Sequence, residues 1–217
     1  NSAYCQKLIE EKDLGDEEGL QSYFIHKMEK YLNAHGRDII GWDEILQGGL
    51  APNATVMSWR GEKGGIKAAN MNHDVIMTPT TYCYFDYYQS KEHDSIRIGG
   101  YLPIQKVYSY NPVGKMDAEA AKYVKGVQAN MWTEYLQWPS SVEFQLFPRM
   151  EAIAEVAWSP TKEKDFKDFS NRLKEAYKRY DLWGVDYSKT FLNNVLLADS
   201  TQTQASEQTK TDSSSEK

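Results

Sequence analysis

The amino-acid sequence predicts an α/β fold of the (β/α)8 TIM-barrel type, present only in part. Short β-branched segments alternate along the chain with segments of helical periodicity, and this alternation is typical of parallel strands joined by crossover helices. Four such strands can be counted, whereas a closed barrel needs eight strands and typically about 250 residues. The 217-residue chain therefore supplies about half of a barrel by strand count.

Four segments have the pattern of helices. The first is expected over 16–34, where Asp16 can cap the start and Gly36 can end the helix. A short helix is expected over 64–70 and a longer one over 140–158. Pro148 lies inside the longer helix and predicts a kink or a break there. The last helix is amphipathic and is marked by Phe166, Phe169, Leu173, Tyr177 and Tyr180.

Four short segments rich in β-branched or apolar residues are expected to form buried strands, at 38–42, 54–59, 74–77 and 124–131. A helical turn is expected over 44–49. Between the third and fourth strands, residues 80–121 show little periodicity, and a loop of that length inside a compact domain is usually functional.

The chain divides into three parts. Residues 1–185 form the predicted barrel part, and residues 186–199 form a terminal extension. Residues 200–217 contain one apolar side chain, Ala205, and are expected to form a disordered polar tail.

Composition bears on partners and location. The net charge is −6, and no run of Lys and Arg suggests nucleic-acid binding. No stretch of about 18 apolar residues predicts a membrane span. Residues 1–6 lack the features of a signal peptide and include no Met, which predicts a processing or cloning boundary at Asn1.

The two cysteines, Cys5 and Cys83, allow two interpretations. They could pair, or they could be two free thiols, and their redox state stays open. No Cys-x-x-Cys metal spacing is present. We expect neither a metal site nor a cofactor.

Aromatic residues gather where the predicted strands end. The chain has 6 Trp and 15 Tyr, a composition that fits either a large aromatic core or a carbohydrate site. Trp42, Trp59 and Trp132 lie at three strand ends, and a Tyr cluster with Asp86 follows the remaining strand. Because active-site residues of such barrels lie at the carboxyl ends of the strands, this repeated placement favours a carbohydrate site.

Several motifs in a fixed order give a specific resemblance, which covers about residues 1–185. They are Gly41-Trp42-Asp43-Glu44-Ile45-Leu46, Gly48-Gly49-Leu50-Ala51-Pro52, Val56-Met57-Ser58-Trp59-Arg60-Gly61, Tyr84-Phe85-Asp86, the run from Gly126 to Glu134, and Phe147-Pro148-Arg149. Together they resemble the family 20 glycoside hydrolases, the β-N-acetylhexosaminidases. The resemblance implies that the chain holds the last four strand–helix units of the catalytic barrel.

The resemblance also implies a reaction. Members of this family hydrolyse terminal N-acetylglucosamine or N-acetylgalactosamine with retention, and the substrate assists the reaction. The oxygen of the 2-acetamido group attacks the anomeric carbon and forms an oxazolinium-like intermediate. An Asp orients the acetamido nitrogen, and an adjacent Glu protonates the leaving oxygen and then activates water.

Site residues follow from the same resemblance. Trp42, Trp59 and Trp132 resemble the ring walls around the acetamido group, and Tyr84 resembles the hydroxyl that binds the acetamido oxygen. Asp86 and Glu134 resemble carboxylates that bind sugar hydroxyls. The alternative for the Trp residues is core packing; for Asp86 it is a solvated loop acid and for Glu134 a structural acid.

Asp43 and Glu44 are adjacent acids after a strand and invite assignment as a catalytic pair. The resemblance argues against this assignment and implies structural hydrogen bonding beneath the pocket. Arg60 is expected to hold a neighbouring acid rather than substrate.

The catalytic Asp-Glu of the family lies in a His-x-Gly-Gly-Asp-Glu run, and no such run occurs in this sequence. The chain is therefore expected to begin just after that pair, to be inactive alone, and to need the N-terminal half of the barrel. One alternative is a non-catalytic module that binds N-acetyl sugars, and another is a structural fragment. The expected ligands are N-acetylhexosamine-terminated glycans or chitin-type oligosaccharides, and the family implies a periplasmic or extracellular location.

Overall fold

The computed structural model of the chain describes residues 2–91 and 97–193. The predicted tail at 200–217 and residues 194–199 of the predicted extension lie outside the described residues. No helix within the described ranges is both long enough and apolar enough to cross a membrane.

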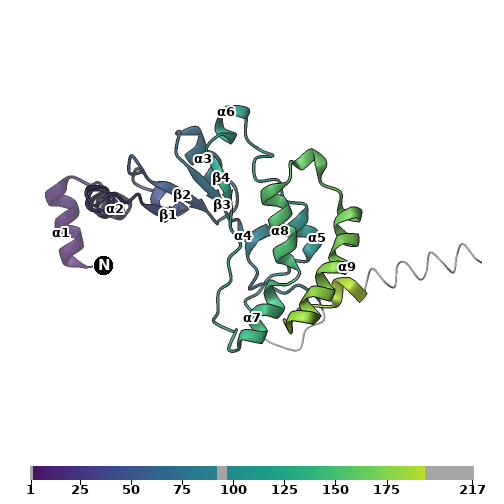
Figure 1. The fold of residues 1–217 in the computed structure, drawn as a ribbon. Coiled ribbons are helices and arrows are strands. Elements are labelled where there is room, and N and C mark those ends of the chain that lie inside the picture. The colour runs from purple at the N-terminus through teal and green to yellow at the C-terminus, as the bar shows by residue number, and fades with distance from the viewer. Residues whose placement is uncertain (1, 92–96, 194–217) are drawn as a thin grey trace, which may run out of the picture.

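The four expected strands form one parallel sheet, which confirms the α/β prediction (Figure 1). The strands are β1 (Ile40–Trp42), β2 (Thr55–Ser58), β3 (Val75–Met77) and β4 (Val124–Val127). They lie side by side in the order β1-β2-β3-β4, which is the sequence order. Their carboxyl ends therefore meet at a single edge of the sheet.

The helices before and between the first strands are α1 (Ala3–Lys12), α2 (Glu17–Ala34), the 3-10 helix η1 (Asp43–Leu46) and α3 (Lys63–Asn70). Of these, α2 and α3 agree with the sequence pattern, whereas α1 was not among the helices it predicted. The side chain of Asp16 accepts a hydrogen bond from the backbone N–H of Gly19, so it caps α2 as predicted. The helix ends at Ala34 with His35 as its C-cap, and Gly36 follows with a φ of 67°, a conformation that glycine adopts without strain.

The later helices are α4 (Thr80–Cys83), α5 (Ile104–Tyr108), α6 (Ala118–Ala121), α7 (Pro139–Leu146), α8 (Arg149–Trp158), the 3-10 helix η2 (Thr161–Glu163) and α9 (Phe166–Trp183). Most of them lie on one side of the sheet, beyond β3 and β4, whereas α6 lies near α3 (Figure 1). The predicted helix over 140–158 breaks into α7 and α8 at Pro148, as its position in the pattern indicates. Asp165 caps α9 through the backbone N–H groups of Lys167 and Asp168.

Two predictions are corrected by the structure. The fourth strand was expected to run to Met131, but it ends at Val127. Its pairing with β3 shifts register between Val75 and Ile76, and Gly126 has a φ of 158°. The segment 80–121, expected to be a loop of little periodicity, contains the three short helices α4, α5 and α6.

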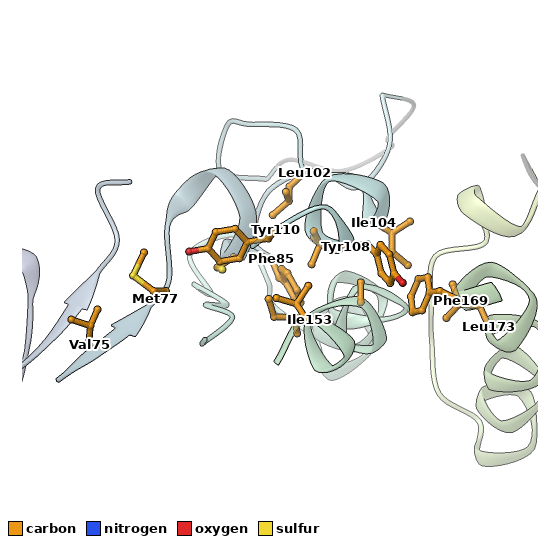
Figure 2. Packing of buried hydrophobic residues seen from close by; sticks show 14 of the residues in the cluster. Val75, Met77, Phe85, Leu102, Ile104, Tyr108, Tyr110, Ile153, Phe169 and Leu173 are labelled. Carbon is orange, nitrogen blue, oxygen red and sulfur yellow. The ribbon is translucent and has the colours of Figure 1, made fainter. Parts of the chain in front are cut away.

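The hydrophobic core lies between the later strands and the helices α5, α8 and α9. Figure 2 shows its buried side chains in a row that runs from Val75 and Met77 of β3 to Phe169 and Leu173 of α9. Tyr187 and Phe191 are buried in the same cluster. The packed body thus continues past residue 185 into the described part of the predicted terminal extension.

Close packing of α3 on the sheet predicts the effect of one substitution. A Cβ atom added at Gly65 would lie 2.5 Å from Sδ of Met77 and 3.0 Å from Cβ of Ser58. We therefore expect Gly65→Ala to lower the free energy of unfolding by about 1–3 kcal/mol, because the helix must move off the strands. Urea or thermal unfolding of the protein that contains this chain measures the change. Lys67→Ala, on the exposed face of α3, is the control, and an equal loss there would contradict the packing explanation.

Candidate functional site

A cavity of about 740 Å³ opens at the carboxyl ends of the strands. All six predicted site residues line it: Trp42, Trp59, Tyr84, Asp86, Trp132 and Glu134. They come from the end of β1 and from the segments that follow β2, β3 and β4, so the parallel sheet brings together positions up to 92 residues apart in sequence (134 − 42). The lining combines aromatic faces with a few carboxylates, the composition of a sugar-binding site.

Two pairs of aromatic rings line the cavity. The ring centroids of Trp42 and Trp132 lie 6.0 Å apart with the planes tilted by 41°. The rings of Trp59 and Tyr84 stack, with centroids 6.3 Å apart. Trp132 is 42% exposed and Trp42 is partly exposed, so neither ring is buried in the hydrophobic core. The rings can therefore contact a ligand.

Asp43 lies beneath the cavity wall and is 2% exposed. One carboxylate oxygen accepts hydrogen bonds from the backbone N–H groups of Trp59 and Arg60, both at 3.1 Å. The other accepts from Nε of Arg60 at 2.5 Å. This ion pair raises the pKa of the Arg60 guanidinium. Asp43 thus fixes the turn after β2, and Arg60 holds a neighbouring acid, as the sequence indicates.

Glu44 orients the ring of Trp59. Its carboxylate accepts a hydrogen bond from the indole Nε1 of Trp59, at 2.9 Å and 3.1 Å to the two oxygens. Glu44 itself lines the cavity. The structural role predicted for the Asp43–Glu44 pair therefore holds, and Glu44 additionally contributes a surface to the site.

Tyr84 reaches the cavity because its segment pairs with the one that follows β4. Tyr84 and Asn130 form an isolated parallel bridge. The backbone N–H of Phe85 donates to the carbonyl oxygen of Asn130, and that of Asn130 donates to the carbonyl oxygen of Cys83, both at 2.7 Å. Burial raises the pKa of the Tyr84 hydroxyl, which stays protonated and able to donate at neutral pH.

Asp86 is the most perturbed carboxyl group of the site. It is 2% exposed, and neither carboxylate oxygen has a hydrogen-bond partner among the described residues. Its pKa is raised to about 6, chiefly by burial; the charge of Glu134 acts in the same direction, and Arg149 opposes both. A buried carboxylate without donors is costly, so a ligand hydroxyl that donates to it would be bound favourably. Glu134, by contrast, is exposed.

Several lining residues were not anticipated from the sequence. They are Gln21, Ile25, Gly41, Ile45, Thr80, Tyr87 and Ile98. Gln21 donates to the carbonyl oxygen of Glu44 at 2.8 Å, which brings α2 against η1 at the cavity. Gly41 and Ile45 belong to the quoted motif that begins at Gly41, and Tyr87 belongs to the Tyr cluster around Asp86, but none of the three was assigned to the site. The other four residues depend on tertiary packing.

Thiols, and side chains of the kinds that can bind a metal, lie elsewhere in the described part of the chain. Cys5 and Cys83 are both free thiols, and burial raises the pKa of Cys83. Within 2–91 and 97–193, no group of three or more His, Cys, Asp and Glu side chains is arranged to hold a metal ion.

Comparison of the sequence with known families and proteins gives consistent matches. The family profile described as "Glycosyl hydrolase family 20, catalytic domain" matches residues 1–161. A β-hexosaminidase of Porphyromonas gingivalis is 53% identical over 186 residues, which cover 84% of this chain and 24% of that protein. A β-N-acetylhexosaminidase of Cellulomonas fimi is 29% identical, over 69% of this chain and 31% of that protein. The chain spans only about a quarter to a third of the length of these relatives.

Solved structures share the fold. An exo-β-N-acetylglucosaminidase of Vibrio harveyi, in complex with N-acetylglucosamine, superposes with a TM-score of 0.77 and 30% identity, over 87% of this chain and 30% of that chain. A β-N-acetylhexosaminidase of Streptomyces coelicolor gives a TM-score of 0.70 and 25% identity, over 78% of this chain and 36% of that chain. These matches confirm the predicted barrel type, with this chain as one part of the domain.

The raised pKa of Asp86 predicts a pH-dependent cost in stability. Its pKa is about 6 in the folded state, against about 3.9 for an unfolded chain. The folded state therefore binds more protons, and stability falls as pH rises from about 4 through 6. We expect Asp86→Asn to be more stable than the wild type by about 1–3 kcal/mol at pH 7.5, with no difference near pH 4.

Urea unfolding at both pH values measures this difference. Asp38→Asn is the control, because Asp38 is exposed in the segment before β1. An Asp86→Asn variant that is less stable than the wild type at pH 7.5 would show that the carboxylate is compensated in the folded protein.

Proposed function

The chain belongs to glycosyl hydrolase family 20, and on that premise we propose that the protein containing it is an exo-β-N-acetylhexosaminidase. It would remove terminal N-acetylglucosamine or N-acetylgalactosamine from glycans or chitin-type oligosaccharides. One observation carries the proposal: the three Trp rings, Tyr84, Asp86 and Glu134 line one cavity at the carboxyl ends of the strands. That set matches the sugar-recognition residues implied by the sequence motifs.

In the proposed reaction the acetamido group of the substrate is the nucleophile. Trp42, Trp59 and Trp132 would enclose this group and hold its oxygen near the anomeric carbon, which replaces an encounter in solution by a fixed geometry. The hydroxyl of Tyr84 would donate to the acetamido oxygen and stabilise the charge that develops as the oxazolinium-like ring closes. Asp86 and Glu134 would accept hydrogen bonds from sugar hydroxyls, and thereby orient the ring.

The proton donor and its orienting partner are proposed to come from another part of the whole protein. No His-x-Gly-Gly-Asp-Glu run occurs in the 217 residues. The chain spans 24% of the P. gingivalis relative and 31% of the C. fimi relative, so ample sequence is available elsewhere in proteins of this kind. Within the chain, Asp43 and Glu44 are already bound to Arg60 and Trp59.

The remainder of the barrel is the proposed structural partner. β1 is an edge strand of the described sheet, and its Ile40 is 55% exposed. An unpaired strand edge with an exposed apolar side chain favours pairing with further strands. A location in the periplasm or outside the cell stays a proposal that rests on the family alone.

The activity can be measured on the whole protein with nitrophenyl N-acetyl-β-glucosaminide. If the acetamido oxygen is the nucleophile, the corresponding glucoside, which lacks that group, should react at least about 10³-fold more slowly. Equal rates on both substrates would contradict substrate assistance. Binding of N-acetylglucosamine in a calorimeter without any turnover would favour the alternative, a non-catalytic sugar-binding protein.

Tyr84→Phe tests the role proposed for the hydroxyl. Because the hydroxyl would stabilise charge in the transition state, we expect kcat to fall about 10²- to 10³-fold while KM changes little. Tyr82→Phe is the matched control, since Tyr82 stacks on Tyr110 with a 4.4 Å centroid separation and does not line the cavity. A loss confined to KM would instead assign Tyr84 to ground-state binding.

A further inference from the structure

Arg149 is the largest fully buried side chain in the described part of the chain, with no exposed surface. It begins α8, about 60 residues after the Tyr84–Tyr87 segment in sequence (149 − 87 = 62). A guanidinium group has five N–H donors, and all five are used. Each of them donates to a backbone carbonyl oxygen and none to a carboxylate, which is unusual because buried charges are normally paired with an opposite charge.

Arg149 donates to four carbonyl groups. Those of Phe85 and Tyr87 belong to the segment that lines the cavity, and that of Leu102 belongs to the chain that returns to this segment. Nη2 donates to the carbonyl oxygen of Phe85, and Nη1 donates to that of Tyr87 at 3.2 Å. Nη1 also donates to the carbonyl oxygen of Leu102 at 3.0 Å. The fourth carbonyl, of Gln145, accepts from Nε at 3.2 Å and from Nη2 at 2.7 Å. The guanidinium also lies over the ring of Phe85, 4.7 Å from its centroid.

Gln145, near the end of α7, holds the same segment a second time. It is 2% exposed, and its side-chain N–H group donates to the carbonyl oxygens of Phe85 at 3.2 Å and Tyr87 at 3.0 Å. The carbonyl groups on both sides of Asp86 are therefore each bound by two side chains. A segment held in this way has little freedom to rotate Asp86 or the preceding Tyr84 away from the cavity.

The charge of Arg149 has a direct electrostatic consequence. The charged or titratable groups that act on Asp86 are Arg149 on α8, Glu134 after β4, and Tyr84 and Tyr87 on its own segment. Arg149 is the only cation among these four groups. Its charge stabilises the ionised form of Asp86, which burial and Glu134 oppose.

We propose that Arg149 is a positioning residue for the reaction: together with Gln145 it clamps the Phe85 and Tyr87 carbonyl groups, so that Tyr84 and an ionised Asp86 face the substrate. The proposal rests on the proposed hydrolase function. It concerns residues that lie outside the cavity lining, and it assigns them to substrate recognition rather than to packing alone.

The test uses the whole protein and nitrophenyl N-acetyl-β-glucosaminide, with kcat/KM measured against pH. Arg149→Met removes the charge, so the pKa of Asp86 should rise and the acid limb of the profile should move up by about one pH unit. The same substitution made in an Asp86→Asn background should cause no such shift. Arg37→Met removes an exposed charge between α2 and β1 and should leave the acid limb in place.

Two further variants separate the clamp from the charge. Gln145→Met loses two carbonyl contacts without any change of charge, and should lower kcat/KM about tenfold per folded molecule with an unmoved acid limb. Arg149→Lys keeps a charge but cannot span four carbonyl groups, and should lower kcat/KM similarly. If Arg149→Met does not fold, the kcat/KM values of Gln145→Met and Arg149→Lys still test the positioning role.

The outcomes are distinct from those that concern the hydrolase itself. An inactive wild-type protein would overturn the proposed function. An active wild type whose Arg149→Lys and Gln145→Met variants lose only thermal stability, with unchanged kcat/KM below their melting temperature, would overturn the positioning role. An acid limb that shifts equally in the Asp86→Asn background would overturn the electrostatic part.

Discussion

Two backbone hydrogen bonds between Asn130 and the Cys83–Phe85 segment hold the cavity together. β3 ends at Met77 and β4 at Val127, so regular pairing stops several residues before the side chains that matter. The bridge between Tyr84 and Asn130 resumes the parallel pairing beyond that gap. The side chain of Asn130 donates to Oγ1 of Thr78 at 2.6 Å and reinforces the junction. Because Trp132 lies two residues after Asn130, the same junction places Trp132 and Tyr84 at one cavity.

The segment from Tyr84 to Asp86 shows how one short stretch serves both the core and the site. In extended backbone, successive side chains point to opposite sides. Phe85 is fully buried in the hydrophobic cluster shown in Figure 2, whereas Tyr84 and Asp86 on either side of it line the cavity. Burial of Phe85 thus fixes the direction of its two neighbours. The carboxylate of Asp86 is left without internal hydrogen bonds, and that cost in stability is what a ligand hydroxyl would relieve.

Part of the fold and of the site follows from local sequence, whereas the rest depends on contacts between residues that are far apart in the chain. Asp16, Asp165 and Pro148 act where their chemistry predicts, as caps and as a helix break, since each effect involves only neighbouring residues. The helices α4 and α6 have four residues each, which is too few for a helical periodicity to be recognised in the sequence. The early end of β4 and the clamp around Arg149 depend on partners far along the chain, up to 64 residues away for Phe85. The sequence motifs therefore identified six of the cavity residues, and they contained Asn130 and Arg149 without showing which groups these two hold.

The carboxylates near the cavity differ in the hydrogen-bond donors within the protein that they already accept from. This difference distinguishes the acids that support the cavity wall from the acid that is open to a ligand. Asp43 accepts from two backbone N–H groups and from Arg60, so its acceptor capacity is committed to the turn after β2. Glu44 faces the cavity, yet both of its oxygens accept from the indole of Trp59. Asp86 has no such donors and is buried. An acid that is adjacent to another in sequence is therefore less informative than a buried acid whose oxygens lack internal donors, because the latter has all of its acceptor sites open to a polyhydroxylated ligand.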